Sequence, residues 1–99
     1  MSTYAQHKAI TKQATLDKIV SLYQKLDDLK ANPETTKRQI GAATAQITKT
    51  RYNHFEAIHG QMVRSGAPYR ESLDEAGDIA AAEVMQALRN AGRENDKYQ

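Results

Sequence analysis

Two prolines divide the 99-residue chain into three segments, and each segment has the apolar spacing of an amphipathic helix. The first break is Asn32-Pro33, where the residue before proline is pushed out of the helical region and proline fits the first turn of the next helix. The second break is the stop signal Ser65-Gly66-Ala67-Pro68. The sequence therefore predicts helices over about 4–31, 34–65 and 72–91.

Apolar side chains recur at steps of three and four residues in each segment. They are Ile10, Ala14, Ile19, Leu22, Leu26 and Leu29, then Ile40, Ala43, Ile47, Phe55, Ile58 and Met62, and finally Ala76, Ala80, Val84, Ala87 and Leu88. Ser72-Leu73-Asp74-Glu75 has the spacing of a capping box, and Gly92 is a typical C-terminal cap. No segment alternates with the period of a strand, so the predicted fold is all-α.

The predicted architecture is a long antiparallel helical hairpin plus a shorter third helix, because two long helices joined by a short turn pack antiparallel. A chain of this length forms a single domain, 1–99, in which residues 93–99 lack periodicity and are expected to fray. Alanine fills fifteen positions and Trp none, so each residue buries little area. We therefore expect a homo-oligomer.

The cysteine count and the hydropathy bear on the compartment. Cysteine is absent, and no apolar run approaches the ~20 residues of a membrane span. The first residues, Met-Ser-Thr-Tyr-Ala-Gln-His-Lys, lack the apolar core of a signal peptide. The expectation is a soluble cytoplasmic protein that does not use a membrane.

His54 and His59 flank Glu56 within the second predicted helix. They are five residues apart, which turns their side chains about 140° from each other, so one metal ion cannot hold both. Partly buried, hydrogen-bonded histidines are expected instead, with no metal. The glycines form no phosphate-binding motif, so no cofactor is expected.

Catalysis requires converging groups with matched roles, and the closest carboxylate pairs are Asp27-Asp28 and Asp74-Glu75. Neighbours in a helix point about 100° apart, and acids in a first turn complement the helix dipole. No residue is predicted to be catalytic, and the protein is expected not to be an enzyme.

The charge is uneven along the chain. Residues 1–64 carry ten Lys and Arg against five acids, whereas residues 65–99 carry four against seven. One interpretation is that the acidic third helix lies against the basic hairpin, within or between subunits. The other is that the hairpin meets a polyanion, with Tyr4 stacking on a base beside Lys8 and Lys12, in a segment that has no acid before Asp17.

The stretch RQIGAATAQI, residues 38–47, continuing to Glu56-Ala57-Ile58, resembles the second hairpin helix of phage anti-CBASS sponges. These are small oligomeric all-α proteins that sequester cyclic nucleotide signals. The resemblance covers residues 4–60, and the matching positions are Arg38, Ile40, Ala43, Ile47, Ala57 and Ile58. It implies that Tyr4 stacks on a base and that Lys18 and Arg38 face phosphates.

The leading functional expectation is a non-enzymatic helical binding protein of phage or mobile-element type, an inhibitor or adaptor that blocks a host protein. The alternative is a sponge for cyclic oligonucleotides. A second alternative is nucleic-acid binding, although the acidic third helix opposes a duplex and no gel shift of duplex DNA is expected at physiological salt.

Overall fold

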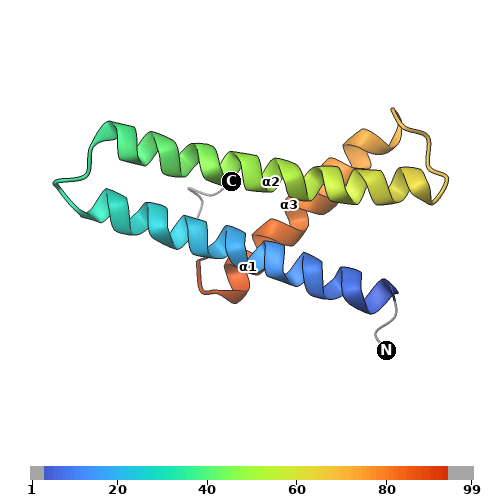
Figure 1. Cartoon of the computed structure of the whole chain (residues 1–99), viewed down its shortest axis with the longest axis horizontal. Helices are drawn as coiled ribbons and strands as arrows, with labels where there is room; N and C mark the ends of the chain where they lie inside the picture. Colours follow the sequence, from blue (N-terminus) through green and yellow to red (C-terminus); the bar gives the residue numbers. More distant parts are fainter. Residues whose placement is uncertain (1–3, 94–99) are drawn as a thin grey trace. The chain divides into compact units, whose positions relative to one another are not determined.

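The computed structural model describes the backbone of residues 4–93 and the side chains of residues 12–93. This part of the chain forms three helices, α1 (Tyr4–Ala31), α2 (Lys37–Arg64) and α3 (Ser72–Asn90), as Figure 1 shows. Residues 4–93 contain no strand, so the all-α prediction is confirmed. No helix in this described part is long and apolar enough to cross a membrane.

The chain forms two compact units, Met1–Thr50 and Arg51–Gln99. The first contains α1 and the first half of α2, and the second contains the rest of α2 and α3. The predicted hairpin pairs α1 with the whole of α2, and α2 continues from the first unit into the second. That hairpin, the single domain and the homo-oligomer stay predictions.

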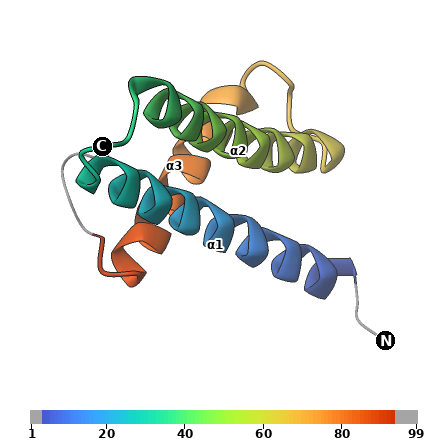
Figure 2. The ribbon, with the colours of Figure 1, turned by 60° about the vertical axis from the view of Figure 1, so that its left-hand side comes forward.

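Residues 32–36 join α1 to α2 within the first unit (Figure 2). The Glu34 N–H donates to Asn32 Oδ1 at 3.0 Å, which forms a turn around Pro33. Thr36 and Gln39 then form a capping box, in which Thr36 N donates to Gln39 Oε1 at 2.9 Å and Gln39 N to Thr36 Oγ1 at 3.2 Å. The prediction that Pro33 opens the second helix is therefore wrong, because the capping box starts that helix at Lys37.

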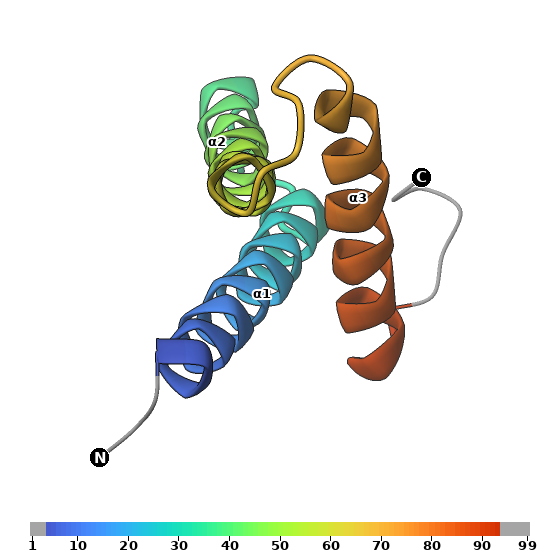
Figure 3. The same cartoon turned by 90° about the vertical axis from the view of Figure 1, so that its right-hand side faces the viewer.

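Residues 65–71 join α2 to α3 within the second unit (Figure 3). Gly66 has a φ of 103°, and the N–H of Ala67 donates to the Met62 carbonyl at 3.0 Å, which is the six-to-one bond of a Schellman motif. Gly92, with a φ of 75°, closes α3 in the same way through a 2.8 Å bond from Arg93 N to the Leu88 carbonyl. Both predicted glycine stops are confirmed.

The start of α3 differs from the prediction. The N-cap residue is Glu71, and its side chain makes no capping hydrogen bond. The Ser72 hydroxyl donates to the Tyr69 carbonyl at 3.2 Å instead of accepting from the first turn of the helix. The predicted capping box at residues 72–75 is therefore wrong, because Ser72 already lies inside the helix.

The predicted seams of α1 and α2 are confirmed in part, because Ile19, Leu26, Ala43 and Ile47 are buried. The other buried residues are Leu16 and Tyr23 in α1, and Thr50, His54 and His59 in α2. The side chain of the predicted Ile10 lies outside the described residues. In α1 the seam includes Tyr23, while the predicted Ala14 is exposed. In α2 it continues through Thr50, whose hydroxyl is satisfied by donating to the Gln46 carbonyl at 2.8 Å.

The buried face of α3 agrees with the prediction. Ala76, Ala80, Val84 and Leu88 recur every four residues and are buried, and Ser72 precedes them on the same face. The predicted Ala87 is half-buried at the edge of this face. Alanine at two of the four apolar positions keeps the area that α3 buries small.

The first testable prediction compares two glycines of opposite backbone geometry. Ala in place of Gly66 must adopt a left-handed conformation, so Gly66→Ala is expected to lower the free energy of unfolding by about 1 kcal/mol. Gly41 lies within α2, and a Cβ added there would have no neighbouring atom within 4 Å. Because glycine inside a helix is less favourable than alanine, Gly41→Ala is expected to raise the free energy of unfolding by about 0.5–1 kcal/mol. Urea unfolding followed by circular dichroism measures both. Shifts of the same sign would contradict the role of Gly66 as the helix stop.

Candidate functional site

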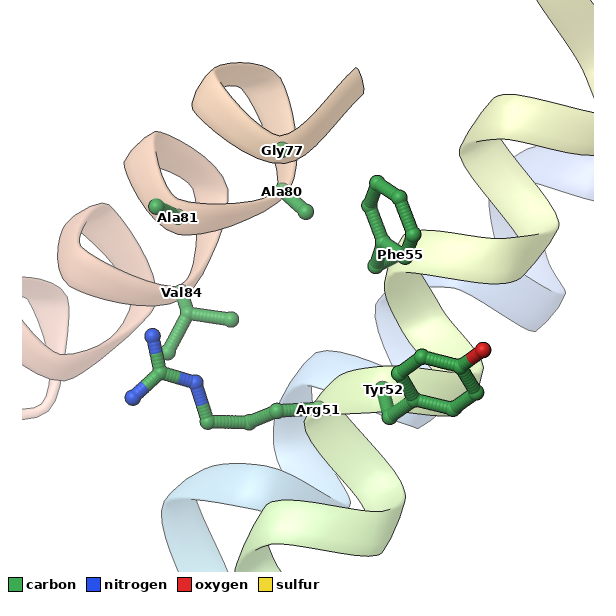
Figure 4. Close-up of a pocket in the computed structure, with 7 residues that line it drawn as sticks. All are labelled: Arg51, Tyr52, Phe55, Gly77, Ala80, Ala81 and Val84. Carbon is green, nitrogen blue, oxygen red and sulfur yellow. The ribbon is translucent and has the colours of Figure 1, made fainter. Parts of the chain in front are cut away.

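A groove of about 340 Å³ lies between α3 and the α2 residues of the second unit (Figure 4). We call it the α2–α3 groove. Its lining residues are Arg51, Tyr52 and Phe55 from α2, and Gly77, Ala80, Ala81 and Val84 from α3. Most of this lining is apolar, which is typical of a recognition surface.

The spacing of the lining residues follows from the two helices. Gly77, Ala80, Ala81 and Val84 lie at intervals of three, four and seven residues, which places them along one side of α3. These small residues leave space opposite Phe55. A Cβ atom added at Gly77 would lie 3.9 Å from Phe55 Cε2, an ordinary contact, so the Phe55 ring lies close to the backbone of α3 at this end.

A row of four rings extends from the groove to the connection between the helices. The ring centroids of Tyr52 and Phe55 are 6.0 Å apart, those of Phe55 and His59 are 5.9 Å apart and nearly parallel, and those of His59 and Tyr69 are 4.7 Å apart and edge-on. The two ends of the row are accessible, since Tyr52 is 56% exposed and Tyr69 is 64% exposed. Exposed tyrosines supply large contact area at a low entropic cost, so this row is suited to binding.

His59 is a structural residue of this row. Its Nε2 lies 2.8 Å from the Tyr69 carbonyl, and because a carbonyl only accepts, this nitrogen carries the proton. The prediction of a hydrogen-bonded histidine is therefore confirmed for His59. Both histidines are more buried than predicted, with His54 at 4% and His59 at 6% exposure. Among the described residues, no group of three or more His, Cys, Asp or Glu side chains is placed to hold a metal ion.

Tyr52 interacts with Glu56, one helical turn further along α2. The hydrogen bond to the Glu56 carboxylate, and then the negative charge of that carboxylate, raise the pKa of the Tyr52 phenol above its ordinary value of 10.0. In Figure 4 the phenol of Tyr52 points away from α3. The hydroxyl of Tyr52 therefore lies outside the groove.

The site residues predicted from the sequence lie in the first unit. Lys12, Lys18 and Arg38 are exposed, and the side chains of Tyr4 and Lys8 lie outside the described residues. Lys12 and Lys18 are six residues apart, so they project about 120° from each other around α1. Arg38 follows the end of α1, and Lys18 lies about 20 Å before that end. Within one copy of this unit the three cations do not converge, and the proposed site stays a prediction.

Sequence reasoning missed the groove. Phe55, Ala80 and Val84 belong to the predicted apolar faces, and nothing in the spacing shows that two such faces leave a space between them. The sequence feature that could have indicated the groove is the aromatic pair Tyr52 and Phe55, together with the small residues Gly77, Ala80 and Ala81 in the third helix.

Comparison with known proteins gives no relative: the chain matches no protein-family model, no curated protein and no solved structure. The resemblance of residues 4–60 to anti-CBASS sponges therefore stays a prediction. The function is inferred from the residues and geometry of this chain.

The second testable prediction concerns the Tyr52 phenol. Glu56→Gln removes the carboxylate and is expected to lower the Tyr52 pKa toward 10.0, measured from the ring signals in a pH titration by nuclear magnetic resonance. Tyr52→Phe assigns the signal, and Glu34→Gln, an exposed acid of the first unit, is the matched control. Because the folded pKa is raised, any stability linked to this phenol is present below pH 10.0 and is lost as the pH rises through the folded pKa. An unchanged Tyr52 titration in Glu56→Gln would contradict the assigned cause.

Proposed function

We propose that this protein is a small non-enzymatic helical binding protein that blocks or sequesters a partner protein, and that the partner docks on the α2–α3 groove. The observation that carries the proposal is the apolar groove itself, bordered by the exposed ring of Tyr52, with Tyr69 at the other end of the ring row. Grooves with exposed aromatic anchors are typical of protein interfaces.

The chemistry of the groove supports binding over catalysis. Arg51 and Tyr52 are the lining residues with ionisable side chains. The raised pKa of Tyr52 keeps its phenol protonated at neutral pH, and an arginine guanidinium does not act as a base. The described residues that line the groove therefore supply a charge and apolar surface, and not a nucleophile with its base.

The proposal includes an oligomer and a cytoplasmic location. Alanine occupies two of the four apolar positions on the buried face of α3, so an association of subunits that covers more apolar surface would stabilise the fold. A hairpin of α1 and α2 along their whole length is part of the same proposal. Absence of cysteine favours a reducing compartment.

A second candidate function is a sponge for cyclic oligonucleotides, favoured by the exposure of Lys12, Lys18 and Arg38 in the first unit. Because these cations are spread over one copy, the ligand would be enclosed by residues from two subunits. Phosphates are held by charge-assisted hydrogen bonds and bases by stacked aromatic rings, which is the role assigned to Tyr4.

The third testable prediction uses two adjacent alanines of α3. Ala81 and Ala82 are both exposed, and Ala81 lines the groove whereas Ala82 does not. Ala81→Trp fills the groove and is expected to reduce capture of the partner roughly tenfold or more, as expected when one apolar anchor is lost. Ala82→Trp is expected to capture the partner protein in the same amount as the unchanged protein. The measurement is affinity capture from bacterial lysate with quantitative mass spectrometry, after circular dichroism shows that both variants fold.

Two outcomes would overturn the groove as the binding site. Proteins retained equally by the unchanged protein, Ala81→Trp and Ala82→Trp bind elsewhere. Loss of capture in both variants would show that the bulk of Trp, and not the filled groove, is responsible.

The fourth testable prediction addresses the sponge. If the sponge function holds, isothermal titration with a panel of cyclic di- and trinucleotides shows binding, and Lys18→Ala and Tyr4→Ala each weaken it by roughly 1–3 kcal/mol. Lys25→Ala, another exposed lysine of α1, is the control. No heat with any nucleotide, from a folded sample, would exclude this second function.

A further inference from the structure

We infer that two copies of this chain associate through exposed rows of opposite charge, with the outer face of α1 in one copy against the outer face of α3 in the other. We call these surfaces the α1 row and the α3 row. The α1 row is Lys18, Ser21 and Lys25, and the α3 row is Glu71, Glu75 and Asp78. This inference rests on the oligomer of the proposed function and names the surfaces that form it.

Each row lies along one face of its helix. Lys18 and Lys25 are seven residues apart, which turns them about 20° from each other and separates them by about 10 Å. Glu71 and Asp78 are also seven residues apart, and the N-cap Glu71 keeps helical angles, with φ −68° and ψ −26°. The charged ends of the two rows are therefore spaced alike along their helices.

The charges of both rows are available to a second copy. All six side chains are exposed. Within residues 12–93, none of the five charged members makes an ion pair or a side-chain hydrogen bond. The nearest acids of α1 are engaged along its flank, since Asp17 accepts from Gln13 and Asp28 from Gln24, each at 2.9 Å. The two lysines thus face solvent without a local carboxylate partner.

The spacing of the rows fits an antiparallel pair of helices. The steps of three and four residues in the α1 row meet the same steps in the α3 row read backwards. An antiparallel arrangement also opposes the two helix macrodipoles, which a parallel one would align. The facing pairs are then Lys18 with Asp78, Ser21 with Glu75, and Lys25 with Glu71.

A second copy of this chain fits these rows because one chain carries both complements. A two-fold symmetric dimer uses each row once in each copy, so the same contact forms twice. A single exposed ion pair contributes little free energy, but here two pairs form in each of two contacts. Like charges oppose the pairing of two α1 rows or two α3 rows, which selects the mixed contact. The association is expected to weaken as salt screens the exposed charges.

The fifth testable prediction reverses the charge of each row in turn. Lys18→Glu with Lys25→Glu makes the α1 row acidic, and Glu71→Lys with Asp78→Lys makes the α3 row basic. Each double variant alone is expected to raise the Kd of self-association roughly tenfold or more, because its contacts become repulsive. An equimolar mixture of the two is expected to associate as the unchanged protein does, since both contacts of the mixed dimer again join opposite charges. Sedimentation velocity over a range of concentrations measures all four samples.

The controls address net charge and folding. Lys30→Glu with Lys37→Glu makes the same change in net charge at exposed lysines outside the row, and is expected to leave the Kd unchanged. If circular dichroism shows that a reversed variant does not fold, Lys18→Gln with Lys25→Gln replaces it and is expected to weaken association severalfold. Neither row includes a lining residue of the α2–α3 groove, so capture of a partner protein by the reversed variants reports the proposed groove separately.

Each other outcome overturns the inference. A monomer of the unchanged protein at every concentration would overturn the oligomer of the proposed function as well. An oligomer that neither reversed variant weakens would keep that oligomer and assign it to other surfaces. Weakening by both reversed variants without recovery in the mixture would exclude a contact between the rows of two copies. An equal effect of the Lys30 and Lys37 control would assign the change to net charge alone.

Discussion

The hydrogen bond from His59 to the Tyr69 carbonyl is the interaction on which the second unit depends. It ties the connection between α2 and α3 to the side of α2, ten residues earlier in the chain. The His59 ring also stacks on Phe55 and meets the edge of Tyr69, so the same side chain fixes one wall of the groove and one exposed tyrosine. A buried polar group that is bonded and packed in this way specifies a single arrangement of its neighbours.

The groove is a consequence of how α3 packs. Its buried face carries alanine at residues 76 and 80, so the helix contributes little volume opposite the large ring of Phe55. Two helices with complementary side chains would fill this space, at the packing density of a protein interior. Small residues on one wall and an aromatic ring on the other leave it open, and the exposed tyrosines extend the apolar surface beyond it. The groove and the small core of this unit thus have the same origin.

Charge reasoning and the structure point to different parts of the chain. The basic residues Lys12, Lys18 and Arg38 suggested a phosphate site in the first unit, where they are exposed but spread along and around α1 and the start of α2. Net charge predicts which ligands are attracted, but it does not bring side chains together. The α2–α3 groove has a different composition, in which Arg51 is the lining cation and most of the other lining side chains are apolar.

The sequence is sufficient to predict the three helices, their glycine stops and the buried face of α3, because these depend on spacing and on local backbone preference. It failed where a polar residue takes a core position: Thr50 and His54 continue the buried seam of α2, and their burial requires partners that no periodicity reveals. Likewise, Thr36 and not Pro33 starts α2, since two reciprocal hydrogen bonds prevail over the preference of proline for a first turn. Only the tertiary structure decided where Phe55 meets Gly77 and where a space remains, because a groove is a property of two packed surfaces and neither surface encodes it alone.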